Sequence, residues 1–403
     1  RRPNTLEDGL TYEIDDDGNL VYDKGVPGSL DTDGRVRTWL SQNKETGRYS
    51  SSRPNLQAIS KKREADYAWI CGTTEKNKKT GEVEPNGRYL RLFRPMYDKQ
   101  IRSIFKAHPG YVLVEADYIG AELAAIGWLA QDPVLTDRVR RNCLPESDPN
   151  YYEIHSQMAV RAFHLECAAT KKGLASIGKI ALRVAAKNIA FGIPYGRGAE
   201  AIARQCREEG VEVSVAECQQ LMDVYFQDYP EVAKFLTLAK DRSQVDRWLA
   251  GSFGRYRRFQ PSSDQAVIGE QERQACNFGI QNCVADALST AICNFYMYQR
   301  INNDASFMLT LPIHDALLFN VRVDALERFC EDKVRQDGSV QRSVLHECMV
   351  DNVPIWPRYL DNTPMRLAEP YRFGIDVAVM THWGETMDHA VAEKLGVPLH
   401  LIH

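Results

Sequence analysis

Strand-like segments at distant places in the sequence constrain the fold of this chain most. Residues 111–116 form an apolar run after the turn His108-Pro109-Gly110, which predicts a strand. Residues 307–313 and 316–321 predict two more strands separated only by His314-Asp315, as in a β-hairpin. An apolar stretch at 373–380 follows near the end of the chain. If these segments share one sheet, the domain that contains the sheet is discontinuous in sequence.

The sequence between these strands is predominantly helical in pattern. Residues 119–131 and 150–240 show helical periodicity, with breaks expected at Gly173 and around Pro194-Tyr195-Gly196. Residues 265–300 predict one or two long helices. We therefore expect an α+β protein in which one lobe holds an antiparallel sheet and a helical lobe interrupts it.

Two aspartates occupy special places relative to the predicted strands. Asp117 follows the strand at 111–116, and Asp315 lies in the hairpin turn. A lone strand-end aspartate is more often a helix N-cap, and aspartate is common in turns. Two carboxylates from separate strands, however, can hold a pair of divalent cations about 3.5–4 Å apart, and such pairs catalyse phosphoryl transfer. The aspartates therefore indicate a candidate two-metal site.

A mixed stripe of cations and aromatics follows on the helical lobe. Its four residues recur every four positions, so each advances about 40° around a helix and all share one slowly turning face. They are Arg183, Lys187, Phe191 and Tyr195. A solvated basic edge beside two buried aromatics is the structural alternative. Beside a metal site, such a stripe could instead hold a polyphosphate.

Composition and charge define the general class of the chain. At 403 residues, with 44% apolar and 26% charged residues, the sequence is typical of a globular protein with two or three lobes. No apolar run is long enough to predict a membrane span. The ten cysteines are scattered, which favours reduced thiols and a cytoplasmic setting over zinc sites or disulfides. The chain does not begin with Met and looks like a fragment.

The net charge of −4 conceals a strong asymmetry. Residues 1–33, which we expect to be irregular or short-stranded, contain nine acidic and three basic residues. Residues 35–106 contain seventeen basic and seven acidic residues, and the part at 60–90 predicts an exposed loop. A solvated charged face is the simple alternative, but a concentrated basic region also suits a phosphate backbone.

In order and spacing, these motifs resemble those of the DNA polymerase I family (family A). The matching segments are Asp117-Tyr118 followed by Glu122, the pattern R-x-x-x-K-x-x-x-F-G-x-x-Y-G from Arg183 to Gly196, and His314-Asp315. The resemblance covers most of the chain from about residue 35. It implies a right-hand polymerase fold, with an antiparallel palm sheet interrupted by a helical fingers subdomain. The implied divisions are the end of an incomplete thumb at 1–34, palm at 35–149, fingers at 150–262 and palm again at 263–403.

The resemblance also implies a metal site. Asp117 and Asp315 would bind two Mg²⁺ ions, or Mn²⁺ in their place, with help from the backbone carbonyl of Tyr118. Arg183 and Lys187 would bind the triphosphate of a dNTP, and Lys187 would protonate the pyrophosphate leaving group.

Further positions would bind the nucleotide. His155 matches a family position near the triphosphate, and Glu122 resembles the steric gate that excludes a ribose 2′-hydroxyl. Phe191 would pack against the incoming nucleotide, and Tyr195 would stand where the templating base enters.

Another set of residues would bind the primer-template DNA. Arg48, in the segment Thr46-Gly-Arg48-Tyr-Ser-Ser51, would contact the minor groove at the primer terminus, and His314 would lie near the primer end. Residues at four-residue spacing on a palm helix would contact template and primer, namely Arg273, Asn277 and Gln281. Minor-groove acceptors are common to all base pairs, so such contacts check pair geometry rather than sequence.

The sequence departs from the family pattern at several positions. Ala316 replaces the acid that usually follows the second aspartate, and Pro194 should end or kink the helix before Tyr195. Ile119, Gly120 and Ala124 replace polar residues. These departures suggest a divergent lineage, such as a phage, plasmid or mobile-element polymerase. The alternatives are a single-subunit RNA polymerase, which Glu122 disfavours, and an inactive DNA-binding module.

Overall fold

The computed structural model describes residues 35–59, 101–356 and 370–402, together with the backbone of a few short strands outside these ranges. Those strands are β1 (Asn4–Thr5), β2 (Thr11–Ile14), β3 (Leu20–Tyr22), β6 (Thr74–Lys76) and β7 (Val83–Pro85). The first three pair in the order β1-β2-β3, and β6 pairs with β7. The segment expected to be a loop at 60–90 therefore contains a hairpin, and its remainder lies outside the described residues. No described helix is long and apolar enough to cross a membrane.

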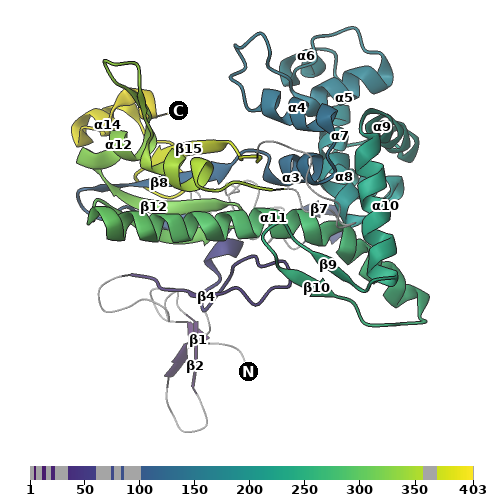
Figure 1. The fold of residues 1–403 in the computed structure, drawn as a ribbon, viewed down its shortest axis with the longest axis horizontal. Helices are drawn as coiled ribbons and strands as arrows, with labels where there is room; N and C mark the ends of the chain where they lie inside the picture. The colour runs from purple at the N-terminus through teal and green to yellow at the C-terminus, as the bar shows by residue number, and fades with distance from the viewer. Residues whose placement is uncertain are drawn as a thin grey trace.

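A four-stranded antiparallel sheet forms one half of the molecule (Figure 1). Its order is β11 (Phe307–Ile313), β12 (Ala316–Arg322), β8 (Tyr111–Tyr118) and β15 (Ile375–Met380). The predicted strands at 111–116, 307–313 and 316–321 and the apolar stretch at 373–380 are confirmed. They meet in one sheet although the helical lobe separates the first from the others.

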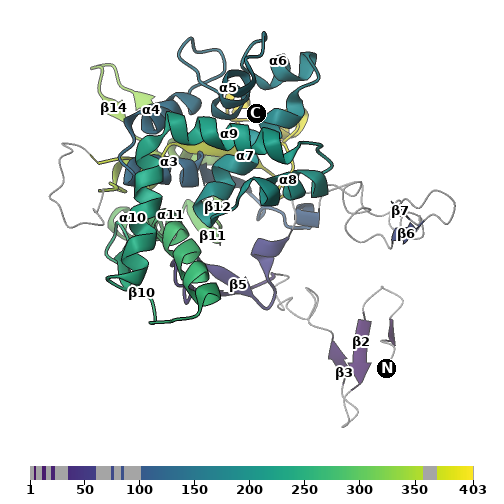
Figure 2. The ribbon, with the colours of Figure 1, turned by 90° about the vertical axis from the view of Figure 1, so that its right-hand side faces the viewer.

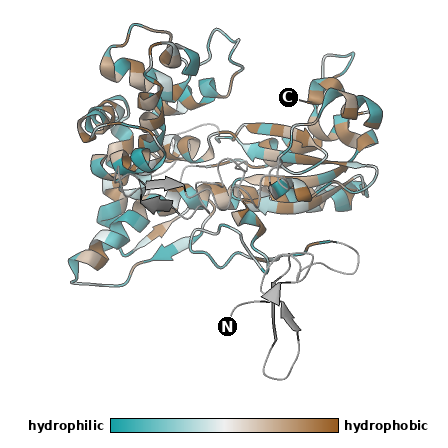
Figure 3. Cartoon of the chain, turned by 180° about the vertical axis from the view of Figure 1, so that it is seen from behind, coloured by the Kyte–Doolittle hydropathy of each residue, from teal (hydrophilic) through white to brown (hydrophobic). Residues whose placement is uncertain are grey.

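The central strand β8 is buried along most of its length because both faces of the sheet are covered. Val112, Val114 and Ala116 belong to the main hydrophobic core. Leu113 points to the other face, where it packs in a smaller cluster with Leu318 and other apolar residues. Continuous hydrophobicity in this strand thus reflects two-sided burial. Figure 3 shows the corresponding hydrophobic colouring along the strands.

One long helix, α11 (Gln265–Asn302), runs along the sheet and continues to the helical lobe (Figure 1). The Asp264 side chain accepts a hydrogen bond from Ala266 N at 2.8 Å at its start, and Asn303 adopts the left-handed conformation at its end. Both are standard end signals. The prediction of one or two helices at 265–300 resolves to a single helix.

The helical lobe lies in sequence between β8 and β9 and stands beside the sheet (Figures 1 and 2). Its helices are α3 (Ala121–Leu129), α4 (Pro133–Asn142), α5 (Ile154–Phe163), α6 (Lys171–Ser176), α7 (Ile180–Gly192), α8 (Ala199–Glu208), α9 (Val215–Asp228) and α10 (Pro230–Gln244). A hairpin of β9 (Trp248–Ala250) and β10 (Tyr256–Arg258) then leads to α11.

One predicted helix break is wrong and the other is confirmed. Gly173 lies inside α6, where its N–H binds the capping hydroxyl of Thr170 at 3.0 Å. A Cβ at this glycine would overlap the carbonyl oxygen of Ala168, so close approach of the backbone explains the residue. At the other site, α7 ends at Gly192, and Pro194 lies in a short 3₁₀ turn, as the missing N–H of proline predicts.

The remaining described β-strands and α-helices belong neither to the four-stranded sheet nor to the helical lobe. They are β4 (Trp39–Ser41), β5 (Ser50–Ser52), α12 (Leu326–Cys330), β13 (Lys333–Val334), β14 (Val340–Gln341), α13 (Val344–His346) and α14 (His389–Leu395). The nine cysteines within the described ranges are free thiols, and five of them are buried.

Candidate active site

The two aspartates come together at one end of the sheet. The ladder pairs Asp117 of β8 with Ala316, the residue after Asp315. In addition, the N–H of Tyr118 donates to the carbonyl oxygen of Asp315 at 3.3 Å. Both aspartates are partly buried. Backbone pairing therefore fixes the two carboxylate-bearing residues next to each other.

The turn that carries Asp315 has the geometry of a tight hairpin. His314 has a φ of 54°, in the left-handed region that primed two-residue turns require at their first position. The imidazole is exposed. Within the described ranges, no group of three or more His, Cys, Asp or Glu side chains is placed to hold a metal ion. A metal site here would therefore depend on the two aspartates, backbone oxygens, water and substrate.

The predicted stripe runs along α7 and ends just beyond it, because Tyr195 lies in the 3₁₀ turn Ile193–Tyr195. Lys187 is exposed, whereas Arg183, Phe191 and Tyr195 are partly buried. The ammonium nitrogen of Lys187 lies 6.0 Å from the centroid of the Phe191 ring. Lys187 makes no ion pair within the part of the chain that the structure describes. In the middle of the stripe, Lys187 is thus an exposed cation that forms no ion pair with a described residue.

Arg183, at the start of the stripe, is held by Glu153. Its two guanidinium nitrogens donate to the two carboxylate oxygens at 2.9 and 3.3 Å. Glu153 also caps α5, accepting from Ser156 N at 2.7 Å. Burial would raise the pKa of Glu153, but hydrogen bonds from Ser156 and Arg183 outweigh it and hold the pKa below its ordinary value. Glu153 therefore remains charged and links α5 to α7.

His155 lies beside this ion pair and close to Phe191, with the two ring centroids 6.2 Å apart. Its Nδ1 is buried without a hydrogen-bond partner among the described residues. Burial lowers the pKa of His155 to about 4; Arg183 and Lys187 act in the same direction, and Glu153 opposes them. The imidazole is therefore neutral near pH 7.

Four predicted residues from four segments form one chain of contacts. Arg48 makes an ion pair with Glu122, which also accepts a hydrogen bond from the Tyr195 hydroxyl at 3.4 Å. Gln281 donates to the same hydroxyl. Burial would lower the pKa of Arg48, but Glu122, with smaller effects from Asp315 and Tyr195, raises it. The region between Glu122 and Asp315 therefore favours a positive charge.

The other two residues predicted on the α11 face differ in environment. Arg273 is exposed and pairs with Glu270 on the same helix, at 2.7 Å. It also lies against Gly196, where a Cβ would come 3.0 Å from its side chain. Asn277 is partly buried, and its carbonyl oxygen has no hydrogen-bond partner among the described residues. Together with Gln281, these two residues therefore form a row on α11 close to the end of the stripe.

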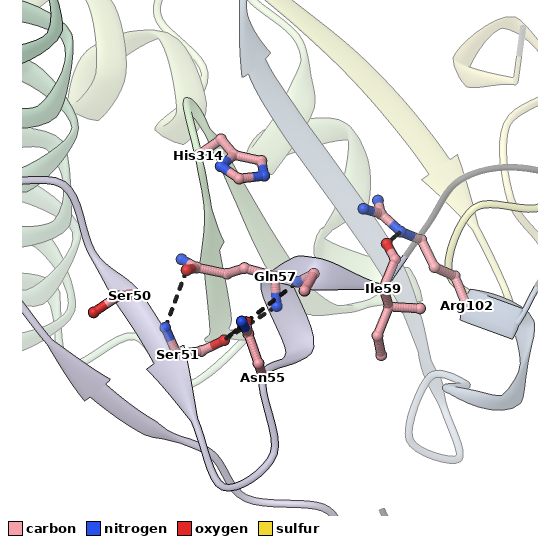
Figure 4. Close-up of a pocket in the computed structure, with 8 residues that line it drawn as sticks. Ser50, Ser51, Asn55, Gln57, Ile59, Arg102 and His314 are labelled. Carbon is pink, nitrogen blue, oxygen red and sulfur yellow. Dashed lines mark hydrogen bonds between the residues drawn. The ribbon is translucent and has the colours of Figure 1, made fainter. Parts of the chain in front are cut away.

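A cavity of about 420 Å³ opens beside His314. It is lined by Ser50, Ser51, Asn55, Gln57, Ala58, Ile59, Arg102 and His314, most of which Figure 4 shows. Gln57 anchors this wall because its amide donates to the carbonyl of Pro312 on β11 at 2.8 Å and accepts from Ser51 N at 3.1 Å. The segment that carries Arg48 is thereby fixed to the sheet edge that carries the aspartates.

Sequence reasoning missed three residues of this region. Glu153 precedes a helix and could have been found as an N-cap beside His155. Gln57 lies six residues after Ser51 at the end of the matched segment, and its contact with Pro312 joins positions far apart in the sequence. Arg102 donates to the carbonyl of Ile59 at 2.9 Å and stacks on Trp383, with 4.2 Å to the ring centroid. No local pattern in the sequence indicates that arrangement.

An antiparallel sheet with two aspartates at one end, interrupted by a helical lobe with a cationic helix, defines the right-hand polymerase class of folds. The sequence model of DNA polymerase family A matches residues 20–356. The chain belongs to this family.

Relatives and a solved structure agree. The chain is 27% identical over 288 residues to the DNA polymerase of Escherichia phage T5, covering 68% of this chain and 33% of the relative. It is 28% identical over 290 residues to DNA polymerase I of Caldicellulosiruptor bescii, covering 71% and 27%. The structure of the POL domain of Pol1 from M. smegmatis, in complex with DNA primer-template and dNTP, superposes with a TM-score of 0.60 at 22% identity. That match covers 89% of this chain and 50% of the other. The chain thus spans about a third or less of the length of these two relatives.

Proposed function

We propose that the protein is a template-directed DNA polymerase that extends a primer 3′ end with dNTPs. The observation that carries the proposal is the position of Asp117, at the end of β8, beside Asp315, in the turn that leads into the paired strand β12. Glu122, on the helix that follows Asp117, is hydrogen-bonded to Tyr195 at the end of the cationic stripe. One continuous surface therefore offers carboxylates for metal ions, cations for a triphosphate and a minor-groove arginine.

The residues present fit two Mg²⁺ ions, which would supply charge neutralisation at the attacking and leaving oxygens. Mg²⁺ is commonly held by one or two carboxylates plus substrate phosphates and water, so a third protein carboxylate is not required. Asp117, Asp315 and the carbonyl of Tyr118 would hold the ions.

The stripe on α7 would bind the triphosphate. Lys187 is exposed and would act as the general acid for the departing pyrophosphate. Arg183 would exchange its contacts with Glu153 for phosphate oxygens. The neutral His155 would add a hydrogen bond rather than a charge. Closure of residues 177–196 over a correct pair would bring these groups together, which makes selection an induced-fit step.

Sugar and base selection would use the other end of the stripe. Glu122 would fill the space that a ribose 2′-hydroxyl needs, with its carboxylate oriented by Arg48 and Tyr195. Phe191 would pack against the nucleotide, and Tyr195 would guard the entry of the templating base. This use of Glu122 favours a DNA polymerase over a single-subunit RNA polymerase.

The primer-template would lie along the sheet end and α11. Arg48, Gln281, Arg273, Asn277 and His314 would contact it, with His314 and the adjoining cavity near the primer terminus. We assign residues 35–149 and 263–403 to the palm and 150–262 to the fingers, with residues 1–34 at the end of a thumb.

Primer extension in the presence of Mg²⁺, of Mn²⁺ or of a chelator tests the proposal. The wild type should extend a primer with dNTPs only when a divalent ion is present. Asp117→Ala and Asp315→Ala should each lower the extension rate by at least about a thousandfold, with primer-template affinity nearly unchanged. Asp324→Ala, at an exposed site beside Arg322, is the matched control.

The alternatives give different results in the same assay. A wild-type protein that binds primer-template but never extends it would be an inactive DNA-binding module. Preferential incorporation of ribonucleotides would favour the RNA polymerase alternative. Near-normal extension by either aspartate variant would remove the two-metal assignment.

A further inference from the structure

The backbone just before Arg48 is held by a buried polar cluster that no sequence motif indicated. Asn282 of α11 donates from its side-chain amide to the carbonyl oxygen of Thr46 at 3.2 Å. The same amide donates to Asp286, one turn later on α11, at 2.8 Å. Asn282 is fully buried and Asp286 nearly so. The contact is therefore shielded from water, where a hydrogen bond to a charged group is strong.

Arg255 of the β9–β10 hairpin completes the cluster. Its guanidinium donates to Asp286 from two nitrogens, at 3.1 and 3.3 Å. It also lies against Gly47, where a Cβ would come 2.8 Å from three guanidinium atoms. Gly47 has a φ of 78°, so glycine satisfies both the backbone conformation and the close approach. A second ion pair, between Arg257 and Glu45, ties the same segment to β10.

Gly251 makes room for this arrangement. A Cβ at Gly251 would overlap the carbonyl oxygen of the Asn282 side chain. The glycine also starts the hairpin turn, with its N–H bonded to the carbonyl of Arg255 at 2.8 Å. The hairpin, the helix and the segment before Arg48 are thus fitted to one another at a single buried point.

Successive residues of α11 hold both ends of the Arg48 contact chain. Gln281 binds the hydroxyl of Tyr195, whereas Asn282 binds Thr46, two residues before Arg48. On its other side, Arg48 is followed by β5, which pairs with β4. The backbone on both sides of Arg48 is therefore held, by the buried cluster before it and by the pairing of β5 with β4 after it. These two supports set the position of the Arg48 guanidinium.

We propose that Asn282, Asp286 and Arg255 are positioning residues for Arg48. They fix the backbone at Thr46 and Gly47 so that the Arg48 guanidinium lies at the level of the primer-terminal base pair. The inference rests on the proposed role of Arg48 in the minor groove. Loss of the cluster should leave Arg48 present but poorly placed, which weakens the distinction between matched and mismatched primer ends.

The test is a double-mutant cycle between Asn282→Ala and Arg48→Ala. Its readouts are primer-template affinity by fluorescence anisotropy and single-turnover extension, each with a matched and a mismatched terminal pair. Asn282→Ala should reduce the matched-to-mismatched ratio by about tenfold, and Arg48→Ala should reduce it at least as much. In the Arg48→Ala background, Asn282→Ala should change the ratio less than twofold.

A second cycle separates local fit from general destabilisation. Gly251→Ala should reduce the ratio in the wild type because the new methyl displaces Asn282. In the Asn282→Ala background the space is open, so Gly251→Ala should add little. Thermal melting of every variant shows whether each remains folded. Gly279→Ala, where a Cβ on α11 would make only ordinary contacts with Phe235 and Leu129, is the matched control.

The outcomes are distinguishable. An equal loss from Asn282→Ala with and without Arg48 would overturn the positioning role and leave a general structural one. An unchanged matched-to-mismatched ratio in a folded Asn282→Ala variant would also overturn it. Failure of the wild type to extend any primer would refute the proposed polymerase function instead, while the affinity readout would still test the coupling of Asn282 to Arg48.

Discussion

The sheet end that carries the aspartates and the cationic stripe on α7 are held in different ways. Asp117 is paired through the backbone with Ala316 on one side and with Asp376 on the other. Among the described residues, the stripe is joined to this region by side-chain contacts, such as the hydrogen bond from Tyr195 to Glu122, while Lys187 is exposed. Backbone ladders fix atoms closely, whereas side-chain contacts can exchange partners. We therefore expect the carboxylates to keep their positions and the cations to change partners when a nucleotide binds.

After the loss of extension expected for Asp117→Ala and Asp315→Ala in the fixed region at the sheet end, the largest expected effect comes from the adjustable region, the stripe. Phe191 is partly buried between Lys187 and His155 and offers no hydroxyl to a nucleotide that lacks its 3′-OH. The wild type should therefore discriminate strongly against dideoxynucleotides. Phe191→Tyr should relax that discrimination by about 3 kcal/mol, which is more than a hundredfold. Competition between dideoxy- and deoxynucleotide on one template measures it.

The control for this variant is Phe253→Tyr, on the exposed turn of the β9–β10 hairpin. It should leave the dideoxy-to-deoxy ratio of the wild type unchanged. Equal ratios for the wild type and Phe191→Tyr would mean that Phe191 does not face the sugar and that the stripe is misassigned.

The next largest effect concerns the contact between the two regions. Glu122→Ala removes the carboxylate that we place in the 2′ space and leaves Arg48 without its ion-pair partner. Ribonucleotide incorporation relative to deoxynucleotide should rise by about 2 kcal/mol, or roughly thirtyfold. Tyr195→Phe removes only the hydroxyl contact with Glu122 and leaves the carboxylate and its ion pair with Arg48 in place, so it should change sugar selection much less. An unaltered ribo-to-deoxy ratio in Glu122→Ala would reopen the RNA polymerase alternative.

A smaller effect should appear in stability against pH. The pKa of His155 falls to about 4 in the folded protein because the ring is buried, so the unfolded chain binds a proton more readily. The contribution of the neutral His155 ring to the free energy of unfolding is fully present at pH values above the pKa of this histidine in the unfolded chain. It is lost as the pH falls towards 4. Between pH 7 and pH 4, the free energy of unfolding should therefore fall by about 1–2 kcal/mol less in His155→Gln than in the wild type.

Urea denaturation of both proteins across that pH range measures the difference. His400→Gln, at an exposed site beside Glu331, is the control and should follow the wild type. Parallel curves for the wild type and His155→Gln would show that the ring is protonated as easily in the folded protein as in the unfolded chain.

The smallest effect tests whether Arg183 changes partners. Glu153→Gln keeps an oxygen that can cap Ser156 but removes the charge that holds Arg183. The KM for dNTP should fall by about threefold, equivalent to less than 1 kcal/mol, with kcat little changed. Glu231→Gln, which breaks an exposed pair with Lys234, is the control. A higher KM would mean that Glu153 orients Arg183 for the phosphate instead of competing with it.

Much of the fold could be predicted from the sequence because its signals are local. The hairpin around Asp315 follows from two apolar runs with two residues between them, and the end of α7 follows from Pro194. The failure at Gly173 has a different cause. A glycine signals both a break and a close approach, and only the position of the Ala168 carbonyl distinguishes the two.

What the sequence by itself determined is which residues we assign to the chemistry and, for most of them, on which local element each stands. The tertiary structure decided their partners: Glu122 for Arg48, Glu153 for Arg183, and the backbone of Thr46 for Asn282. A charged or amide side chain bonds to whatever the fold brings within about 3 Å. The spacing of residues along the chain does not encode that distance, so the buried cluster behind Arg48 became visible only once α11, the β9–β10 hairpin and the Arg48 segment met in space.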